Sequence, residues 1–139
     1  MREYFAQFDQ RIQTWLDQGY GSCVLQDKSN CQIVEETLWH FAGERYHIYA
    51  YVVMANHVHV LFMPAGENSV SRIVAGWKQF TAHRINERLG RENHLWQKES
   101  FDTLVRNERH FQTIVQYIKR NDCERAWWWD KDVQFPLSA

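Results

Sequence analysis

Proline and cysteine are both scarce in this chain of 139 residues, which contains two prolines and three cysteines. Cys23, Cys31 and Cys123 are odd in number and include no C-x-x-C pair. This pattern argues against a dense disulfide framework and against a cysteine-rich zinc site. It is typical of the reducing cytoplasm, which is the localisation that the sequence predicts.

Long apolar runs and linkers are also missing. No stretch approaches the roughly 20 apolar residues that cross a bilayer, and the first residues lack the basic segment and apolar core of a signal peptide. The sequence has no internal repeat, no low-complexity segment and no linker rich in proline or glycine. We therefore expect a single domain over residues 1–139 that does not contact a membrane.

A large excess of charge of one sign is absent as well, because the formal net charge is −1. Basic residues nevertheless outnumber acidic ones after residue 70, which is compatible with a partner that carries phosphates. Aromatic residues are plentiful, with seven tryptophans. A buried tryptophan stabilises a core and an exposed one can stack on a nucleic-acid base, so composition alone does not separate these uses.

Apolar periodicity predicts the secondary structure. Steps of three and four residues predict helices over residues 3–18, 29–41, 69–89 and 107–122. Runs rich in β-branched and aromatic residues predict strands over residues 22–25, 45–55, 57–63 and 100–105. The middle two strands are expected to pair as a hairpin around Asn56. The run Trp127-Trp128-Trp129 has no usable period. Helices and strands mix without regular βαβ units, which favours an α+β domain with a mainly antiparallel sheet and helices packed on its faces.

The segment His57-Val58-His59 lies in the second strand of the predicted hairpin. Residues i and i+2 of a strand point to the same face, so the two imidazoles stand side by side. They are then close enough to share one metal ion. The alternative is a pair of half-exposed histidines with no common ligand.

Tyr117 and Asn121 are four residues apart in the last predicted helix. This spacing places them on one helix face, about one turn apart, so that a phenol and an amide are presented together. The alternative is a tyrosine at the edge of the core followed by an asparagine that ends the helix.

Brought into one site, these residues suggest a reaction. A phenol, with an ordinary pKa of about 10, is a poor nucleophile at neutral pH. A divalent cation held by His57, His59 and the Asn121 carbonyl would offset the negative charge that builds on a phosphodiester under attack. Tyr117 would then form a phosphotyrosine bond, and the reverse step would join strands. Imidazole ligands suit Mn better than Mg, which prefers oxygen.

Five segments of the chain, taken together, resemble the single-tyrosine HUH transposases, in particular the REP-associated tyrosine transposases. The resemblance runs from about Gly43 to Asn121. In chain order the segments are Val53-Met54-Ala55-Asn56-His57-Val58-His59-Val60-Leu61, Trp77-Lys78, Leu95-Trp96-Gln97, Ser100-Phe101-Asp102 with Val105-Arg106, and Tyr117-Ile118-Lys119-Arg120-Asn121. One segment alone would be weak, but all five in this order are specific.

The resemblance implies a ferredoxin-like antiparallel sheet, with the H-x-H motif on a strand and the tyrosine on a C-terminal helix. It also implies that His57 and His59 bind a divalent metal, Mg or Mn, in a site that Asn121 completes. Tyr117 is by the same resemblance the catalytic nucleophile, which forms a 5′-phosphotyrosine intermediate. The expected substrates are hairpins in single-stranded DNA, which the enzyme would cleave and rejoin.

The start of the chain departs from this family, whose members usually carry a strand before the first helix. Here residues 3–18 are predicted to be helical. On that prediction the sheet lacks the family's first strand, borrows one from the other copy in a homodimer, or covers its edge in some other way.

Four further residues have open roles. Lys78 is expected either to contact DNA phosphates or to belong to a solvated helix face. Trp96 is expected to stack on a DNA base or to fill a gap in the core. Gln97, which follows it in a polar loop, is expected to bind DNA. Asp102 is a weaker candidate that would join the metal or orient a histidine, unless it is an exposed strand carboxylate.

Three other functions remain open at this stage. A non-catalytic module could bind single-stranded or hairpin DNA without cleaving it. A small metallohydrolase could use His57 and His59 with water as the nucleophile. A purely structural protein would require these two side chains to lie in different environments.

Overall fold

The computed structural model describes residues 11–18, 23–92, 94–121 and 126–132. An antiparallel sheet of five strands forms its centre, in the order β4-β1-β3-β2-β5. The strands are β1 (Ile12–Asp17), β2 (Tyr46–Val53), β3 (His57–Pro64), β4 (Phe101–Leu104) and β5 (Ala126–Trp129). The helices are α2 (Lys28–His40), α3 (Val70–Leu89) and α4 (Glu108–Arg120), with a short 3-10 turn, η1 (Val24–Gln26). The predicted α+β class with an antiparallel sheet is thus confirmed.

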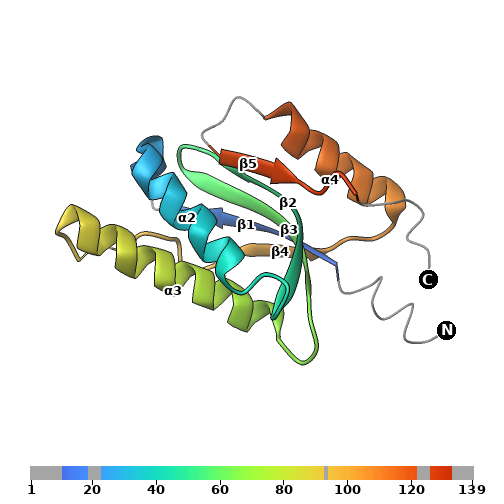
Figure 1. Ribbon diagram of the computed structural model, residues 1–139, viewed down its shortest axis with the longest axis horizontal. Coiled ribbons are helices and arrows are strands. Elements are labelled where there is room, and N and C mark those ends of the chain that lie inside the picture. The colour runs from blue at the N-terminus through green and yellow to red at the C-terminus, as the bar shows by residue number, and fades with distance from the viewer. Residues whose placement is uncertain (1–10, 19–22, 93, 122–125, 133–139) are drawn as a thin grey trace.

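Helices cover both faces of the sheet, with α2 and α3 on one side and α4 on the other (Figure 1). Strand β3 contributes side chains to two hydrophobic cores, one on each face of the sheet. Val58, Val60 and Phe62 are buried against α2 and α3, whereas His59 and Leu61 point to the α4 side. Successive strand residues face opposite ways, so the H-x-H motif lies on the face that α4 covers.

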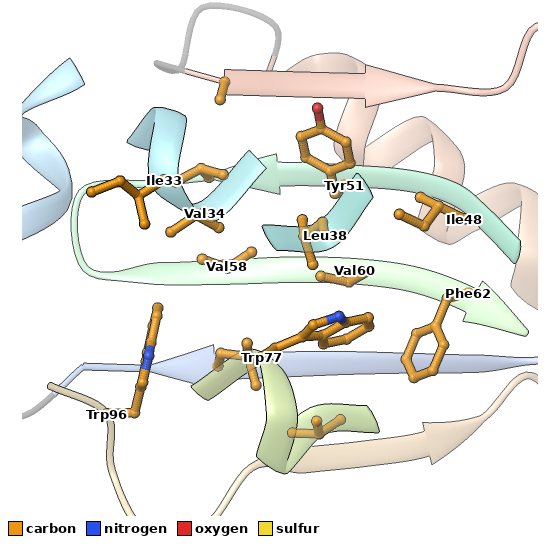
Figure 2. Packing of buried hydrophobic residues seen from close by; sticks show 14 of the residues in the cluster. Ile33, Val34, Leu38, Ile48, Tyr51, Val58, Val60, Phe62, Trp77 and Trp96 are labelled. Carbon is orange, nitrogen blue, oxygen red and sulfur yellow. The ribbon is translucent and has the colours of Figure 1, made fainter. Parts of the chain in front are cut away.

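The larger core lies between the sheet and the two helices α2 and α3. Figure 2 shows Trp77 of α3 lying over the sheet beside Val60 and Phe62, with Leu38 of α2 between Val60 and Tyr51. The indole of Trp77 also donates a hydrogen bond to the Tyr46 hydroxyl over 2.9 Å. This core therefore fixes α3 firmly against one face of the sheet.

The helix ends follow the expected local chemistry. Ser69 caps α3 by accepting a hydrogen bond from the backbone N–H of Arg72, and Gly90 ends the helix in the left-handed conformation at φ 67°. The side chain of Asn107 caps α4 in the same way. None of the described helices is both long and apolar enough to span a membrane.

The helix predicted over residues 3–18 is wrong for residues 12–17, which form strand β1; residues 3–10 lie outside the described part of the chain. Ile12 and Leu16 belong to the core under α3, whereas Trp15 points the other way, in the alternating pattern of a strand. β1 lies between β4 and β3, so the strand thought to be missing is present inside the sheet.

One smaller prediction is also wrong, and one segment without a prediction is now assigned. The strand expected over residues 22–25 is instead the 3-10 turn η1 at its described end. The Trp127-Trp128-Trp129 run forms the edge strand β5, which pairs with β2. Trp128 packs against the core on the α2 side and Trp129 against the core on the α4 side. This tryptophan run therefore closes one edge of the sheet between both cores.

Candidate functional site

The two histidines of the H-x-H motif stand at the beginning of β3, next to β1. Trp15 of β1 lies directly opposite His59 in the antiparallel register. The indole stacks on the His59 ring with ring centroids 3.8 Å apart and planes 10° apart, and its distance to the His57 ring is 5.2 Å. Both imidazoles thus share one face of the sheet and one aromatic neighbour.

Tyr117 reaches the same place from the helix. α4 buries Ile114 and Ile118 against the sheet, and this packing holds Tyr117 at the edge of the helix with 39% of its surface exposed. Its ring centroid lies 5.7 Å from that of His59 and 5.7 Å from that of Trp15. The phenol and the strand histidines therefore meet within one subunit, and the tyrosine is accessible to a large ligand.

His59 is the most enclosed of these residues, with 2% of its surface exposed. Burial, and secondarily the charge of His57, lowers the pKa of His59 from the ordinary 6.5 to about 3. Its Nε2 lies 3.0 Å from the Gln13 side-chain oxygen, and its Nδ1 is buried without a hydrogen-bond partner among the described residues. The ring is therefore neutral at physiological pH and keeps one nitrogen without a partner.

The lowered pKa of His59 predicts a pH-dependent stability. An unfolded chain protonates this ring near pH 6.5, whereas folded His59 stays neutral down to about pH 3. Unfolding therefore takes up about one proton in this window, and the free energy of unfolding should fall as the pH is lowered from 6.5 towards 4. Above pH 6.5 this contribution is fully present.

Denaturant titrations of the metal-free protein at pH 7.5, 6.5, 5.5 and 4.5 would measure this slope, with His59→Gln as the comparison. A nitrogen-resolved NMR spectrum of the imidazole provides a second measurement that needs no variant. A positively charged His59 ring in the folded protein at pH 5 would contradict the expectation.

Gln13 connects the site to a third histidine. Its side-chain nitrogen lies 3.3 Å from Nε2 of His110, while its oxygen contacts His59. Gln13 and Trp15 are two residues apart in β1 and so point to the same face of the sheet. The amide of Gln13 therefore holds the His59 ring from the side opposite its unpartnered nitrogen.

His57 and Asn121 have hydrogen bonds that orient them. Nδ1 of His57 lies 2.8 Å from the side-chain oxygen of Asn56, an arrangement that puts the ring proton on Nδ1 and the lone pair on Nε2. Asn121 donates its side-chain N–H to the Tyr117 carbonyl over 2.7 Å, which leaves its amide oxygen as an acceptor one turn after the tyrosine. Both residues thus present an atom that can bind a cation.

No cluster of three or more histidine, cysteine, aspartate or glutamate side chains occurs within the described ranges. A metal at the histidine pair would therefore need a ligand of another kind, and the candidate is the amide of Asn121, one helix turn after Tyr117. Neutral imidazoles suit a divalent transition-metal cation better than Mg, and Mn also accepts an amide oxygen. The donor set fits a metal in its chemistry.

The three residues expected to bind DNA lie on α3 and in the loop before β4. Lys78 of α3 donates to the backbone carbonyls of Gln97 and Lys98 over 3.1 and 3.3 Å, so it holds the loop before β4. The side chain of Gln97 is exposed in that loop. Lys78 and Trp96 lie on the α3 side of the sheet, whereas the backbone N–H of Gln97 donates to the carbonyl of Asp17, the residue opposite His57 in the register of β1 and β3.

The structure corrects the expected stacking of Trp96 on a DNA base. It is 8% exposed, it belongs to the core under α3, and its indole N–H donates to the Thr81 hydroxyl over 2.8 Å. Figure 2 shows it among the buried side chains near Val58. A ring buried to this extent has no exposed face for a DNA base. Trp96 therefore fills a gap in the core, which was the alternative expectation.

Asp102 does not join the histidines. It pairs in register with Thr14 across β1 and β4 and accepts a hydrogen bond from the Thr14 hydroxyl. Thr14 alternates with Trp15 and so faces the α3 side of the sheet. The sheet itself therefore separates the Asp102 carboxylate from His57 and His59.

Trp15 and Gln13 are the site residues that the sequence reasoning missed. Both lie in the segment predicted to be a helix. A helix would not pair with β3, so the prediction gives no contact with His57 or His59. The signal that could have found them is the alternation of Ile12, Thr14 and Leu16 with polar or aromatic neighbours, because alternation is the mark of a half-buried strand.

Two solved structures are similar to this chain in fold. The chain is similar to the solved structure of a REP-associated tyrosine transposase bound to a REP hairpin, with a TM-score of 0.65 and 19% identity over 83% of this chain and 67% of that one. It is also similar in fold to a candidate transposase from Deinococcus radiodurans, with a TM-score of 0.57 and 18% identity over 79% and 88% of the two chains.

No curated protein matches the chain in sequence. The family model described as transposase, IS200-like, however, matches residues 19–121. That range contains the H-x-H motif, helix α4 and Tyr117. The chain therefore belongs to the family of IS200-like transposases.

Proposed function

We propose that this chain cleaves and rejoins single-stranded DNA that carries hairpins, with Tyr117 as the nucleophile and a divalent metal at His57 and His59. The observation that carries the proposal is the meeting of three rings on one sheet face. The exposed Tyr117 ring lies 5.7 Å from that of the neutral, buried His59. Family membership supports a transposase-like action on DNA, and a structural relative was solved with a DNA hairpin bound.

The reaction would proceed by transesterification. The Tyr117 oxygen attacks a backbone phosphorus, and the bond from phosphorus to the 3′ oxygen breaks. The phenol proton leaves to solvent, and the departing 3′ oxygen takes up a proton from solvent. The products are a 5′-phosphotyrosine and a free 3′ hydroxyl. Attack by the 3′ hydroxyl of another strand reverses the step and releases the tyrosine, so joining requires no nucleotide cofactor.

A divalent cation, when bound, would supply positive charge beside the phosphate. His57 through Nε2, His59 through its unpartnered Nδ1, and the Asn121 side-chain oxygen are the groups that would hold it. Gln13 and Asn56 would orient the two rings by accepting their N–H groups. Of the two expected ions, Mn fits two nitrogen ligands better than Mg.

The test is the covalent adduct itself. Wild-type protein is incubated with a labelled DNA hairpin flanked by single strands, with Mn, with Mg or with a chelator. We expect a protein–DNA adduct that survives denaturation, requires metal, and maps by mass spectrometry to the peptide that contains Tyr117. Cleavage without an adduct would indicate a metallohydrolase that uses water. Binding without cleavage would indicate the non-catalytic DNA-binding module.

A variant of Gln13 tests metal affinity separately from DNA cleavage. Replacing Gln13 by Met removes the acceptor for the His59 N–H but keeps a side chain of similar length. We expect Mn affinity, measured by calorimetry, to fall by about 10- to 100-fold, as is typical when a partner of a metal-bound histidine is lost. Gln32→Met on the exposed side of α2 is the matched control. Equal Mn affinity in the two variants would show that Gln13 does not position His59.

A further inference from the structure

A groove of about 770 Å³ opens on the opposite side of the sheet from Tyr117. It lies between the second half of α2 and the first half of α3, which run side by side on that face (Figure 1). Its floor contains Trp77 and Tyr46, two buried rings joined by a hydrogen bond. The groove therefore has a rigid base, and none of the residues assigned to the candidate site lines it.

The charge of this groove is positive. Arg45 and Arg72 line it, and no described lining residue is an aspartate or glutamate. Neither guanidinium is in an ion pair with a carboxylate of the described residues. Arg45 is held over the Phe41 ring, 3.6 Å from its centroid. In a chain with 17 acidic residues and a net charge of −1, a concave surface of this kind favours an anion.

The wall of the groove carries an exposed aromatic face. Phe80 of α3 is 51% exposed, although it lies on a helix whose other large apolar residues in this region are buried. The ring of His40 from α2 lies nearly parallel to it, with planes 16° apart and centroids 6.3 Å apart. Flat rings suit an unpaired nucleotide because they stack on its base. Guanidinium groups that are in no ion pair with a carboxylate can bind its phosphate.

Gly76 keeps space open in the same groove. It lies inside α3, where a glycine costs about 0.5–1 kcal/mol relative to alanine. Close packing does not require it, because a Cβ at this position would meet no atom within 4 Å. A larger side chain at residue 76 would instead extend into the groove that Gly76 lines. Gly76 thus leaves the groove open at this point of α3.

We propose that this groove binds one unpaired nucleotide of a DNA substrate, with its base on Phe80 and its phosphate at Arg72 and Arg45. The DNA partner rests on the proposed function, but this contact is separate from cleavage. β3 begins at His57 and ends at Pro64, which pairs with Tyr46 at the groove. At about 3.3 Å per residue, the Tyr46 end of the groove lies about 20 Å along β3 from His57, and the sheet separates the groove from the histidine pair. The groove would anchor the DNA at a distance from the reacting bond.

The test measures DNA affinity without metal, by fluorescence anisotropy, so that no cleavage is needed. Gly76→Leu fills the groove with a good helix former and should therefore keep α3 intact. Phe80→Ala removes the stacking face, and Leu89→Ala, an exposed apolar residue farther along α3, is the control. We expect Gly76→Leu and Phe80→Ala to weaken binding of a hairpin with unpaired flanks by about 10-fold or more, and Leu89→Ala to leave it unchanged.

Two other ligands define the chemistry. A blunt duplex without unpaired nucleotides should bind equally to wild type and to both groove variants, and a free deoxynucleotide should bind far more weakly than the hairpin. A free nucleotide that binds as tightly as the hairpin would make the groove a nucleotide site and overturn the DNA contact. Unchanged hairpin affinity in both variants would also overturn the proposal. Because wild-type adduct formation is a separate measurement, its failure would count against the chemistry of Tyr117 and not against the groove.

Discussion

Tyr117→Phe is expected to abolish the covalent protein–DNA adduct, with any remaining strand cleavage at least about 10³-fold slower than in the wild type. The substitution removes one oxygen, which is the proposed nucleophile, and keeps the ring that contacts Trp15 and His59. No hydrogen bond joins this hydroxyl to another described residue, so the free energy of unfolding should change by less than about 0.5 kcal/mol. A gel assay with labelled DNA under denaturing conditions measures the adduct.

The matched control is Tyr49→Phe, because Tyr49 is packed on the same side of the sheet. Its hydroxyl has only a long contact, 3.9 Å, with the sulfur of Met63. This variant should form the adduct at the wild-type rate. Tyr117→Phe should still bind the hairpin DNA with wild-type affinity. An adduct that persists in Tyr117→Phe would show that another residue is the nucleophile and would remove the basis of the proposed reaction.

His57→Ala is expected to have the second largest effect, and it acts on the metal. The variant removes one of two imidazole ligands but leaves the buried His59 and its contact with Gln13 in place. We expect Mn affinity to fall by at least about 100-fold and metal-dependent cleavage to fall with it. His57 is only half-buried at the beginning of β3, so the fold should survive, which circular dichroism would verify.

His94→Ala tests whether the loss of any histidine weakens Mn binding, since His94 is exposed in the loop before β4. Its Mn affinity should equal that of the wild type. Raising the Mn concentration should restore cleavage by His57→Ala in part but should never rescue Tyr117→Phe. The metal model fails if His57→Ala binds Mn as tightly as the wild type does.

Much of the architecture follows from local patterns. The helices that contain Trp77 and Tyr117 and the hairpin with the H-x-H motif all occur near their predicted positions. Their signals are long and periodic, and Ser69 and Gly90 mark helix ends by chemistry that acts within a few residues. Such elements could be predicted because their geometry depends on neighbours in the sequence.

The elements that could not be predicted depend on distant parts of the chain. Residues 12–17 carry both a helical and an alternating pattern, and the choice of a strand comes from pairing with β3, more than 40 residues later. Strand β5 is similar, because Trp127 and Trp128 become strand residues only by pairing with β2. The sequence left two roles open for Trp96, and the hydrogen bond to Thr81 and the core under α3 decide for burial. Burial is decided by long-range packing that no local period contains.

By itself, the sequence determined the chemical groups of the candidate site. The spacing of His57 and His59 places two imidazoles on one strand face, and the spacing of Tyr117 and Asn121 places a phenol and an amide on one helix face, because backbone periodicity is a local property. Only the tertiary structure decided that these two faces meet, that Trp15 and Gln13 of β1 complete the surroundings of His59, and that the sheet separates them from Asp102. The burial of apolar side chains from elements far apart in the chain determines which faces meet. The free energy of this burial depends on the whole fold.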